Sequence, residues 1–305
     1  MRTFTLINKD GAKYDVTTKN SIFFHSITGL GFEKESEFQR IDERFKLLKS
    51  QYAQQKIEGI VRFWQPNAEQ AYFDFAQFCQ NEPIRMAYNP KSGNVSSSGY
   101  ENAYVDGTGL FLPSKYLSYE NYYRDGYITK IERSDGVDES LTIKIQFTAR
   151  TPWFKTVSEY NYGGTVSARK KFDYTYPYNY NGGAQNTVVI DSDSWMQSPV
   201  RLIIMGGAEN PRWNHYLNGE LQTTGKIIGT ILPGNKLVID TTTIPYTIKE
   251  YDANGNEVLD MYQLSDFSTE RFVRLGHGRN MITVGADDVS ELGVGVEAQI
   301  EYATV

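Results

Sequence analysis

Alternating apolar and polar residues predict that most of this chain forms β-strands. Residues 4–7 and 14–17 alternate on either side of a turn at 9–11, which is typical of a β-hairpin. Residues 57–64 alternate so regularly that Ile57, Gly59, Val61 and Phe63 are expected on one face of a strand. The pattern therefore favours a mainly β fold for the first half of the chain.

One segment of the first half has the period of a helix instead, and we expect that helix over about residues 67–81. Pro66-Asn67 is a helix-start signal, and the Asn67 side chain is expected to cap the backbone N–H of Gln70. The segment ends before Pro83. The apolar stripe consists of Ala68, Ala71, Tyr72, Phe75, Ala76, Phe78 and Cys79.

Residues 32–56 fit two patterns. A helix is one alternative, because Phe45, Leu48 and Tyr52 have helical spacing. Alternation on both sides of Asp42-Glu43 favours a charged, projecting hairpin, which we call the arm and which is the interpretation we adopt. The alternating positions are Phe38, Arg40, Phe45 and Leu47.

The second half predicts a β-sandwich, with about nine or ten strands separated by turn signals at short intervals. Asn218-Gly219 is expected to form a type I′ hairpin turn. We therefore predict an N-terminal β-rich barrel or sandwich domain with one helix over residues 1–154, and a C-terminal sandwich over 184–305. Residues 155–183, rich in Tyr, Gly and Asn, are expected to be a linker with an edge strand. Residues 89–119 are a long exposed region without an assigned role.

Composition narrows the class of protein. The chain has 305 residues, enough for two domains at roughly 150 residues each. Its 31 Lys and Arg against 37 Asp and Glu give a net charge of -6, which disfavours nucleic-acid binding. A single cysteine excludes an internal disulfide, and three scattered histidines do not suggest zinc. There is no membrane-length apolar run and no signal-peptide pattern at the start, so we expect synthesis and folding in a cytoplasm.

Two kinds of enzyme motif are missing from this sequence, whereas a glycan-active enzyme with two converging carboxylates stays an open alternative, since any two of the 37 acids could supply the pair. There is no Gly-x-Ser-x-Gly and no phosphate-binding glycine loop in its required context. Residues 252–257 resemble a calcium loop only weakly and fit a hairpin turn better. We therefore expect no catalytic residues, no cofactor and no metal. Exposed aromatics of the sandwich are candidate glycan or partner contacts, although packing in the core is the commoner role of such rings: Trp213, Tyr216 and Trp195.

Several segments, in the right order along almost the whole chain, resemble the distal tail (Dit) proteins of long-tailed, siphovirus-type bacteriophages of Gram-positive bacteria. The strand at 143–147 running into Thr148-Ala149-Arg150-Thr151-Pro152-Trp153-Phe154 resembles the end of their N-terminal domain. Segments that resemble their second domain are 198–206, 210–213, 234–240, 262–267 and 272–280.

The resemblance implies a structural hub of the phage tail tip. Its first domain would form a hexameric ring around a central channel, through which DNA passes without specific binding. Its second domain would be a galectin-like β-sandwich on the outside of the ring. The expected partners are other copies of the chain, the tail tube protein, the tail-associated tail-tip hub protein and receptor-binding proteins, all in the virion and none in a membrane.

The arm then has an expected role, because unpaired strand edges find partners in a neighbouring protomer. Candidate ring-interface residues are Phe38, Arg40, Phe45, Leu47 and Tyr52. We expect residues 32–56 to contribute more to the ring interface than any other segment. The alternative function is a carbohydrate-binding host-adhesion module that acts through the exposed aromatics of the C-terminal sandwich.

Overall fold

The chain divides into two structural units, each with its own core. Unit 1 comprises Met1–Phe154 with Ala303–Val305, and unit 2 comprises Lys155–Tyr302. The computed structural model describes residues 3–16, 22–64, 67–90, 104–105, 111–112, 121–135, 140–161, 185–289 and 292–305. Both units are built mainly of antiparallel strands, so the expected mainly β fold is confirmed.

Unit 1 is a curled sheet in the strand order β2-β1-β7-β10-β11-β6-β3. The two ends of this order meet, because the Phe24 N–H on β3 donates to the Val16 carbonyl, just after β2, at 2.8 Å. The sheet is therefore close to a closed barrel. Its strands are β1 (Thr3–Ile7), β2 (Lys13–Asp15), β3 (Ile22–Thr28), β6 (Lys56–Phe63), β7 (Ile84–Asn89), β10 (Tyr122–Asp135) and β11 (Leu141–Ala149).

The alternation on β6 accounts for one wall of the barrel core. Ile57, Val61 and Phe63 are completely buried, as the sequence pattern predicts. Gly59 lies in the same row, and the Phe24 ring occupies the space that a side chain would take there. A Cβ at Gly59 would lie 2.3 Å from that ring.

The helix α1 (Ala68–Cys79) lies within the predicted range and covers the barrel through Phe75. The Phe75 ring makes edge contacts with Phe63 at 5.8 Å and with Tyr14 at 5.3 Å between ring centroids. The expected cap is wrong, because Asn67 occupies the N-cap position with a side chain that makes no capping hydrogen bond.

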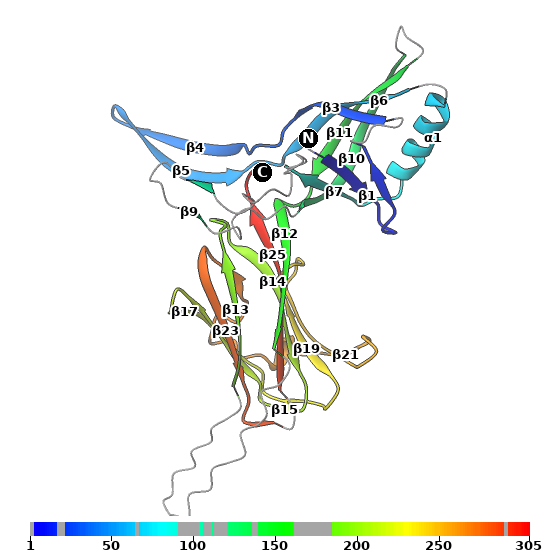
Figure 1. Cartoon of the computed structure of the whole chain (residues 1–305). Coiled ribbons are helices and arrows are strands. Elements are labelled where there is room, and N and C mark those ends of the chain that lie inside the picture. Colours follow the sequence, from blue (N-terminus) through cyan, green and yellow to red (C-terminus); the bar gives the residue numbers. More distant parts are fainter. Residues whose placement is uncertain are drawn as a thin grey trace, which may run out of the picture. The chain divides into compact units, whose positions relative to one another are not determined.

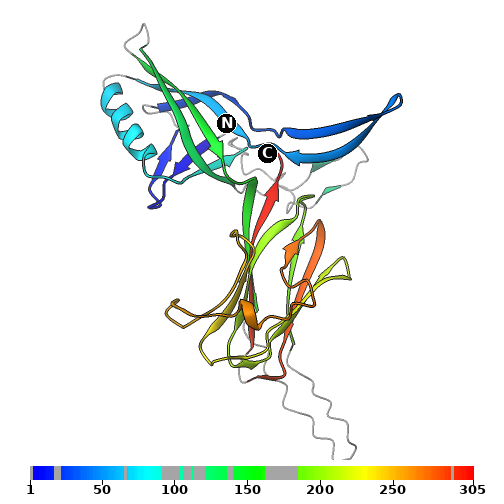
Figure 2. The ribbon, with the colours of Figure 1, turned by 180° about the vertical axis from the view of Figure 1, so that it is seen from behind.

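Residues 34–52 form a hairpin of two long strands, and the helical alternative is wrong. β4 (Lys34–Ile41) and β5 (Arg44–Tyr52) pair only with each other among the described strands. Both ribbon views show this hairpin extending away from the barrel of unit 1, with α1 at the opposite end of the unit (Figure 1, Figure 2). A second short pair, β8 (Tyr104–Val105) and β9 (Phe111–Leu112), lies in the region 89–119, most of which is outside the described residues.

Unit 2 is a sandwich of two main antiparallel sheets. Their strand orders are β13-β23-β16-β17 and β12-β25-β14-β19-β20-β21. The strands of the first sheet are β13 (Gln185–Ser192), β16 (Arg212–Leu217), β17 (Glu220–Lys226) and β23 (Gly278–Gly285). Those of the second are β12 (Trp153–Asn161), β14 (Ser198–Met205), β19 (Lys236–Asp240), β20 (Thr247–Tyr251), β21 (Glu257–Asp260) and β25 (Gly293–Tyr302).

Short elements join these strands. They are β15 (Ala208–Glu209), β18 (Thr230–Ile231), β22 (Arg274–Leu275), β24 (Asp288–Val289) and the 3₁₀ helix η2 (Tyr262–Leu264). The segment predicted as a linker begins as the strand β12, and residues 162–184 lie outside the described part of the chain. The core between the sheets is apolar and includes the fully buried Trp213, Leu202 and Val296.

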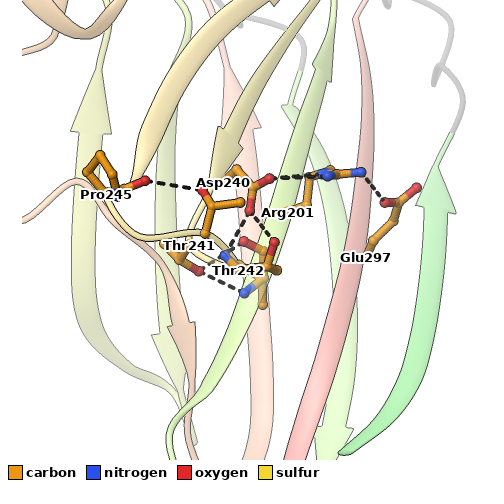
Figure 3. Close-up of polar contacts among 8 residues, drawn as sticks. Arg201, Asp240, Thr241, Thr242, Pro245 and Glu297 are labelled. Atoms are coloured by element: carbon orange, nitrogen blue, oxygen red, sulfur yellow. Dashed lines mark hydrogen bonds and ion pairs between the residues drawn. The ribbon is translucent and has the colours of Figure 1, made fainter. Parts of the chain in front are cut away.

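A polar network links three strands of the second sheet of unit 2 (Figure 3). Arg201 on β14 donates twice to one carboxylate oxygen of Asp240 on β19, at 3.2 Å each, and once to Glu297 on β25 at 3.4 Å. The other Asp240 oxygen accepts from the backbone N–H and the hydroxyl of Thr242, at 2.7 and 2.6 Å. Thr241, directly after β19, also bonds to β14, since its hydroxyl donates to the Val200 carbonyl at 2.9 Å.

Candidate assembly and binding surfaces

The register of the arm decides which of its side chains share a face. Residues directly opposite each other in an antiparallel pair lie on the same face, and faces alternate along each strand. Phe38 pairs with Leu47 and Arg40 with Phe45, whereas Lys34 pairs with Tyr52. Near the base, the hydroxyls of Ser36 and Ser50 lie 3.2 Å apart, in agreement with this register.

A β-bulge keeps these residues on one face along the whole arm. The pairing shifts by one residue between Glu37 and Phe38, which leaves Leu48 as the additional residue on β5. Without the extra residue, Leu47 and Tyr52, five positions apart, would lie on opposite faces. With it, all five candidate interface residues share one face, which we call the apolar face: Phe38, Arg40, Phe45, Leu47 and Tyr52.

The apolar face is open to solvent. Phe45 is 70% exposed and Phe38 57%, and every residue of β5 is exposed. Burial of one such side chain is worth about 1.5–3 kcal/mol. A partner surface of matching shape that covers the apolar face would therefore gain this free energy of burial.

At the base of the arm, an ordered cluster continues this face. The ammonium group of Lys34 lies 5.0 Å from the centroid of the Tyr52 ring and 5.7 Å from that of Phe32. The two rings meet edge to face at 5.7 Å. Cation–π and edge contacts of this kind fix the rings without burying them.

The opposite face of the arm is polar. Gln51 donates to Glu35 at 3.1 Å, and Gln39 is paired with Lys46 across the two strands. The arm is thus a two-stranded ribbon with one apolar and one charged face. Its outer strand edges have no strand partner among the described residues. An unpaired edge beside an apolar face is typical of a surface that pairs with another chain.

The three candidate aromatics of unit 2 lie in different environments, and they do not form a common platform. Trp213 is completely buried, and its indole N–H donates to the Arg271 carbonyl at 2.9 Å. Trp213 as a surface contact is therefore a wrong prediction, because a ring in the core cannot stack on a ligand. Tyr216, on the same strand, is half-buried.

Trp195 lies in the loop between β13 and β14 and is 85% exposed. One face of its indole stacks on His277, with 3.7 Å between ring centroids and 15° between the planes. No local pattern in the sequence points to His277, which is 82 positions away from Trp195 along the chain. The two meet because Ser192 at the end of β13 pairs with Gly278 at the start of β23.

Reactive groups do not gather at any described position. The part of the chain that the structure describes contains no group of three or more His, Cys, Asp or Glu placed to hold a metal ion. Cys79 is buried, and desolvation raises the pKa of its thiol to about 12, which keeps it protonated. His215 is also buried, and desolvation lowers its pKa. Over the same residues, no helix is long and apolar enough to span a membrane.

Comparisons with known proteins agree with the resemblance seen in the sequence. The family model described as distal tail protein, N-terminal domain, matches residues 3–99. No curated protein matches the chain. Among solved structures, a chain of the phage P2 baseplate in its activated conformation with Ca covers the whole of this chain and is itself covered completely, at 14% identity and a TM-score of 0.58.

A second solved structure is the SPP1 Dit protein, described as a paradigm of the hub adsorption apparatus in phages that infect Gram-positive bacteria. The similarity covers 97% of this chain and 98% of that one, at 8% identity and a TM-score of 0.58. At such low identity the likeness concerns the fold, and the sequence match at 3–99 concerns the N-terminal domain. The chain thus carries the N-terminal domain of the distal tail proteins, and its resemblance to that family is confirmed.

Proposed function

We propose that this protein is the structural hub of a phage tail tip or baseplate, and that six copies form a ring around a central channel. The observation that carries the proposal is the arm, with its exposed apolar face and its unpaired strand edges. In the ring, the apolar face of each arm contacts the next protomer. This assigns the protein to the virion and gives it no catalytic role.

A second copy of the chain is the partner that suits the arm best. A ring with one protomer type needs two surfaces on each protomer that differ from each other and fit together. The arm extends away from the barrel of its own unit, so its apolar face is available to a neighbour (Figure 2). The tail tube protein, the tail-tip hub protein and receptor-binding proteins are the further partners that we propose for such a ring.

DNA passage sets a condition on the channel. A channel that DNA traverses must not hold a polyanion tightly, because each cation that contacts a phosphate adds affinity. The net charge of -6 agrees with that condition for the chain as a whole. We therefore propose passage without specific binding.

The experiment that tests the ring is light scattering behind size exclusion, with two matched pairs of substitutions on the arm. We expect the wild-type chain to give six times the protomer mass of 34.8 kDa. Phe38→Ser with Leu47→Ser changes one pair on the apolar face and is expected to give folded monomers. Gln39→Ser with Lys46→Ser changes the adjacent pair on the polar face and is expected to keep the ring.

Deletion of residues 33–55 is a second test, and it too is expected to give folded monomers. Circular dichroism and the melting temperature establish folding in each case. If hexamers survive the deletion, the role of the arm is contradicted. The same holds if both substituted pairs destabilise the hexamer equally. A wild-type chain that stays monomeric at every concentration would contradict the ring.

The alternative function, a carbohydrate-binding adhesion module, keeps one of its three candidate residues. Trp195 alone combines an exposed ring with an ordered environment. Sugar binding at that residue is compatible with a hub, because it would involve unit 2, whereas the arm belongs to unit 1.

A further inference from the structure

The loop that carries Trp195 is held by hydrogen bonds, although the Trp195 ring is exposed. Its backbone lies in the loop 193–197, where the Ser194 hydroxyl accepts the Met196 N–H at 3.0 Å. On the far side of the loop, Arg274 donates to the Gln197 carbonyl at 2.7 Å. These two hydrogen bonds fix the backbone of the loop next to Trp195, and the stack on His277 orients the indole itself.

The loop beneath the indole is fixed by a buried asparagine. Asn280 is 1% exposed, and its side-chain oxygen accepts the Gly276 N–H at 3.0 Å. Its amide group donates to the carbonyls of Gly276 and Gly278, at 2.9 and 3.0 Å. His215, in the core, pairs with the same Asn280 oxygen at 3.0 Å. Buried polar networks of this kind hold one conformation.

A second asparagine fixes the backbone at His277. The Asn218 amide donates to the His277 carbonyl at 3.3 Å, and its oxygen accepts the Arg279 N–H at 2.9 Å. Gly278 has a φ of +110°, and a Cβ there would lie 2.3 Å from the Asn218 oxygen. The positive φ and the close approach of Asn218 both favour glycine at this position, and the backbone on either side of the imidazole that stacks on Trp195 is fixed.

The surroundings of the indole are polar. In the two loops that form the stack and at the turn 218–219, the exposed side chains other than Trp195 belong to Asp193, Gln197 and Asn218, and Arg279 is exposed at the start of β23. A protein-binding hot spot has an apolar core of several side chains inside its polar rim. Here a single exposed aromatic plane lies in loops whose other exposed side chains are polar, and that combination suits a small ligand with one apolar face and a polar edge.

We propose that Trp195, supported by His277, is the stacking platform of a binding site for one pyranose ring of a saccharide. The C–H face of a pyranose covers about one indole, and its hydroxyls project at the edge, where they meet the polar side chains of the two loops. The site is specific to unit 2 and does not depend on the ring that we propose for the hub.

Ligand-observed saturation-transfer NMR on the full chain tests this site. The probes are the methyl pyranosides of glucose, galactose, N-acetylglucosamine and rhamnose. We expect at least one to bind with a dissociation constant of about 1 mM, as a single stacked ring allows, with transfer strongest to the protons of one ring face. Trp195→Ala is expected to weaken binding at least about tenfold, and Trp195→Phe to restore part of it.

Two further variants separate the site from the rest of the molecule. His277→Ala removes the support of the indole and is expected to weaken binding several-fold. Trp64→Ala changes an exposed tryptophan of unit 1 and is expected to leave binding unchanged. The proposal is overturned if none of the four pyranosides binds at about 10 mM, or if Trp195→Ala and Trp64→Ala bind alike. It is also overturned if Trp195→Ala abolishes only the capture of a purified tail protein.

Discussion

Gly29 lies against the backbone of Lys56 where the chain leaves the barrel for the arm and returns. A Cβ at Gly29 would lie 2.0 Å from the Lys56 carbonyl oxygen, and Gly29 has a φ of +82°. Gly29→Ala is expected to destabilise unit 1 by more than the backbone strain alone. Gly11→Ala is the control, because Gly11 has a φ of +80° with nothing within 4 Å of its Cβ position. That control should cost about 1–2 kcal/mol. If both variants lose the same free energy of unfolding in urea, Gly29 and Lys56 are not in close contact at the base of the arm.

Truncation of the two tryptophans of unit 2 is expected to affect stability very unequally. Trp213→Ala removes a completely buried ring and should lower the free energy of unfolding by about 3–5 kcal/mol. Trp195→Ala removes a ring that is 85% exposed and should change it by about 0.5 kcal/mol or less. Chemical denaturation of both variants measures the difference. A large loss for Trp195→Ala would mean that its stack on His277 holds the fold and is not a platform for a ligand.

Asp240 is expected to matter more for its hydrogen bonds than for its charge. Its side chain is 8% exposed, whereas that of Arg201 is 45% exposed, which weakens the ion pair. Asp240→Asn keeps an acceptor for Thr242 and should cost about 1 kcal/mol. Asp240→Ala leaves the Thr242 backbone N–H without its partner and should cost about 2–3 kcal/mol. The network of Figure 3 would be electrostatic instead if the two variants were equally destabilised and Arg201→Gln matched them.

The raised pKa of the Glu301 carboxyl predicts a loss of stability at high pH. Burial raises the pKa of its carboxyl to about 7, and Arg274 opposes part of that rise. A carboxyl with a raised pKa is more easily kept protonated in the folded state than in the unfolded state. The contribution of Glu301 to the stability of the fold is therefore complete below about pH 4.5 and is lost as the pH rises through about 7. Glu301→Gln keeps the shape without the charge, so it should melt at a higher temperature than wild type at about pH 8 and at a similar one at about pH 5.

Glu297→Gln is the matched control for Glu301 because it lies on the same strand. The Glu297 carboxylate accepts from the Tyr160 hydroxyl at 2.5 Å and from Arg201. Loss of its charge should leave the melting temperature at about pH 8 unchanged or lower. If Glu301→Gln also fails to raise the melting temperature at about pH 8, the Glu301 carboxyl is not buried in the folded protein.

Strand alternation and turn chemistry allowed much of the fold to be predicted. The type I′ turn is confirmed, since Asn218 and Gly219 both have positive φ, at +52° and +91°. The ambiguity at the arm has a physical cause. The bulge at Leu48 inserts one residue into β5, so Phe45, Leu48 and Tyr52 acquire the spacing of a helix although they lie on a strand. Strict alternation cannot reveal such an insertion, because the partner strand determines where it falls.

The candidate residues of unit 2 show a second limit. A sequence identifies Trp213 and Trp195 as large aromatics near turns, but not which one lies between the sheets. Burial of Trp213 depends on the space left by Gly225 on the neighbouring strand, where a Cβ would lie 2.3 Å from the indole. The stack of Trp195 on His277 depends on the pairing of β13 with β23. Both are long-range contacts that no local pattern encodes.

The arm is an insertion between two strands that pair with each other. β3 and β6 are neighbours in the barrel, and Thr28 just before the arm pairs with Glu58 just after it. The hydrogen bonds of the barrel therefore do not run through the arm, and its length and sequence are free to change without rebuilding the sheet. Protomers with arms exchanged between related chains should fold alike yet recognise different neighbours, so the specificity of assembly can evolve separately from the stability of the fold.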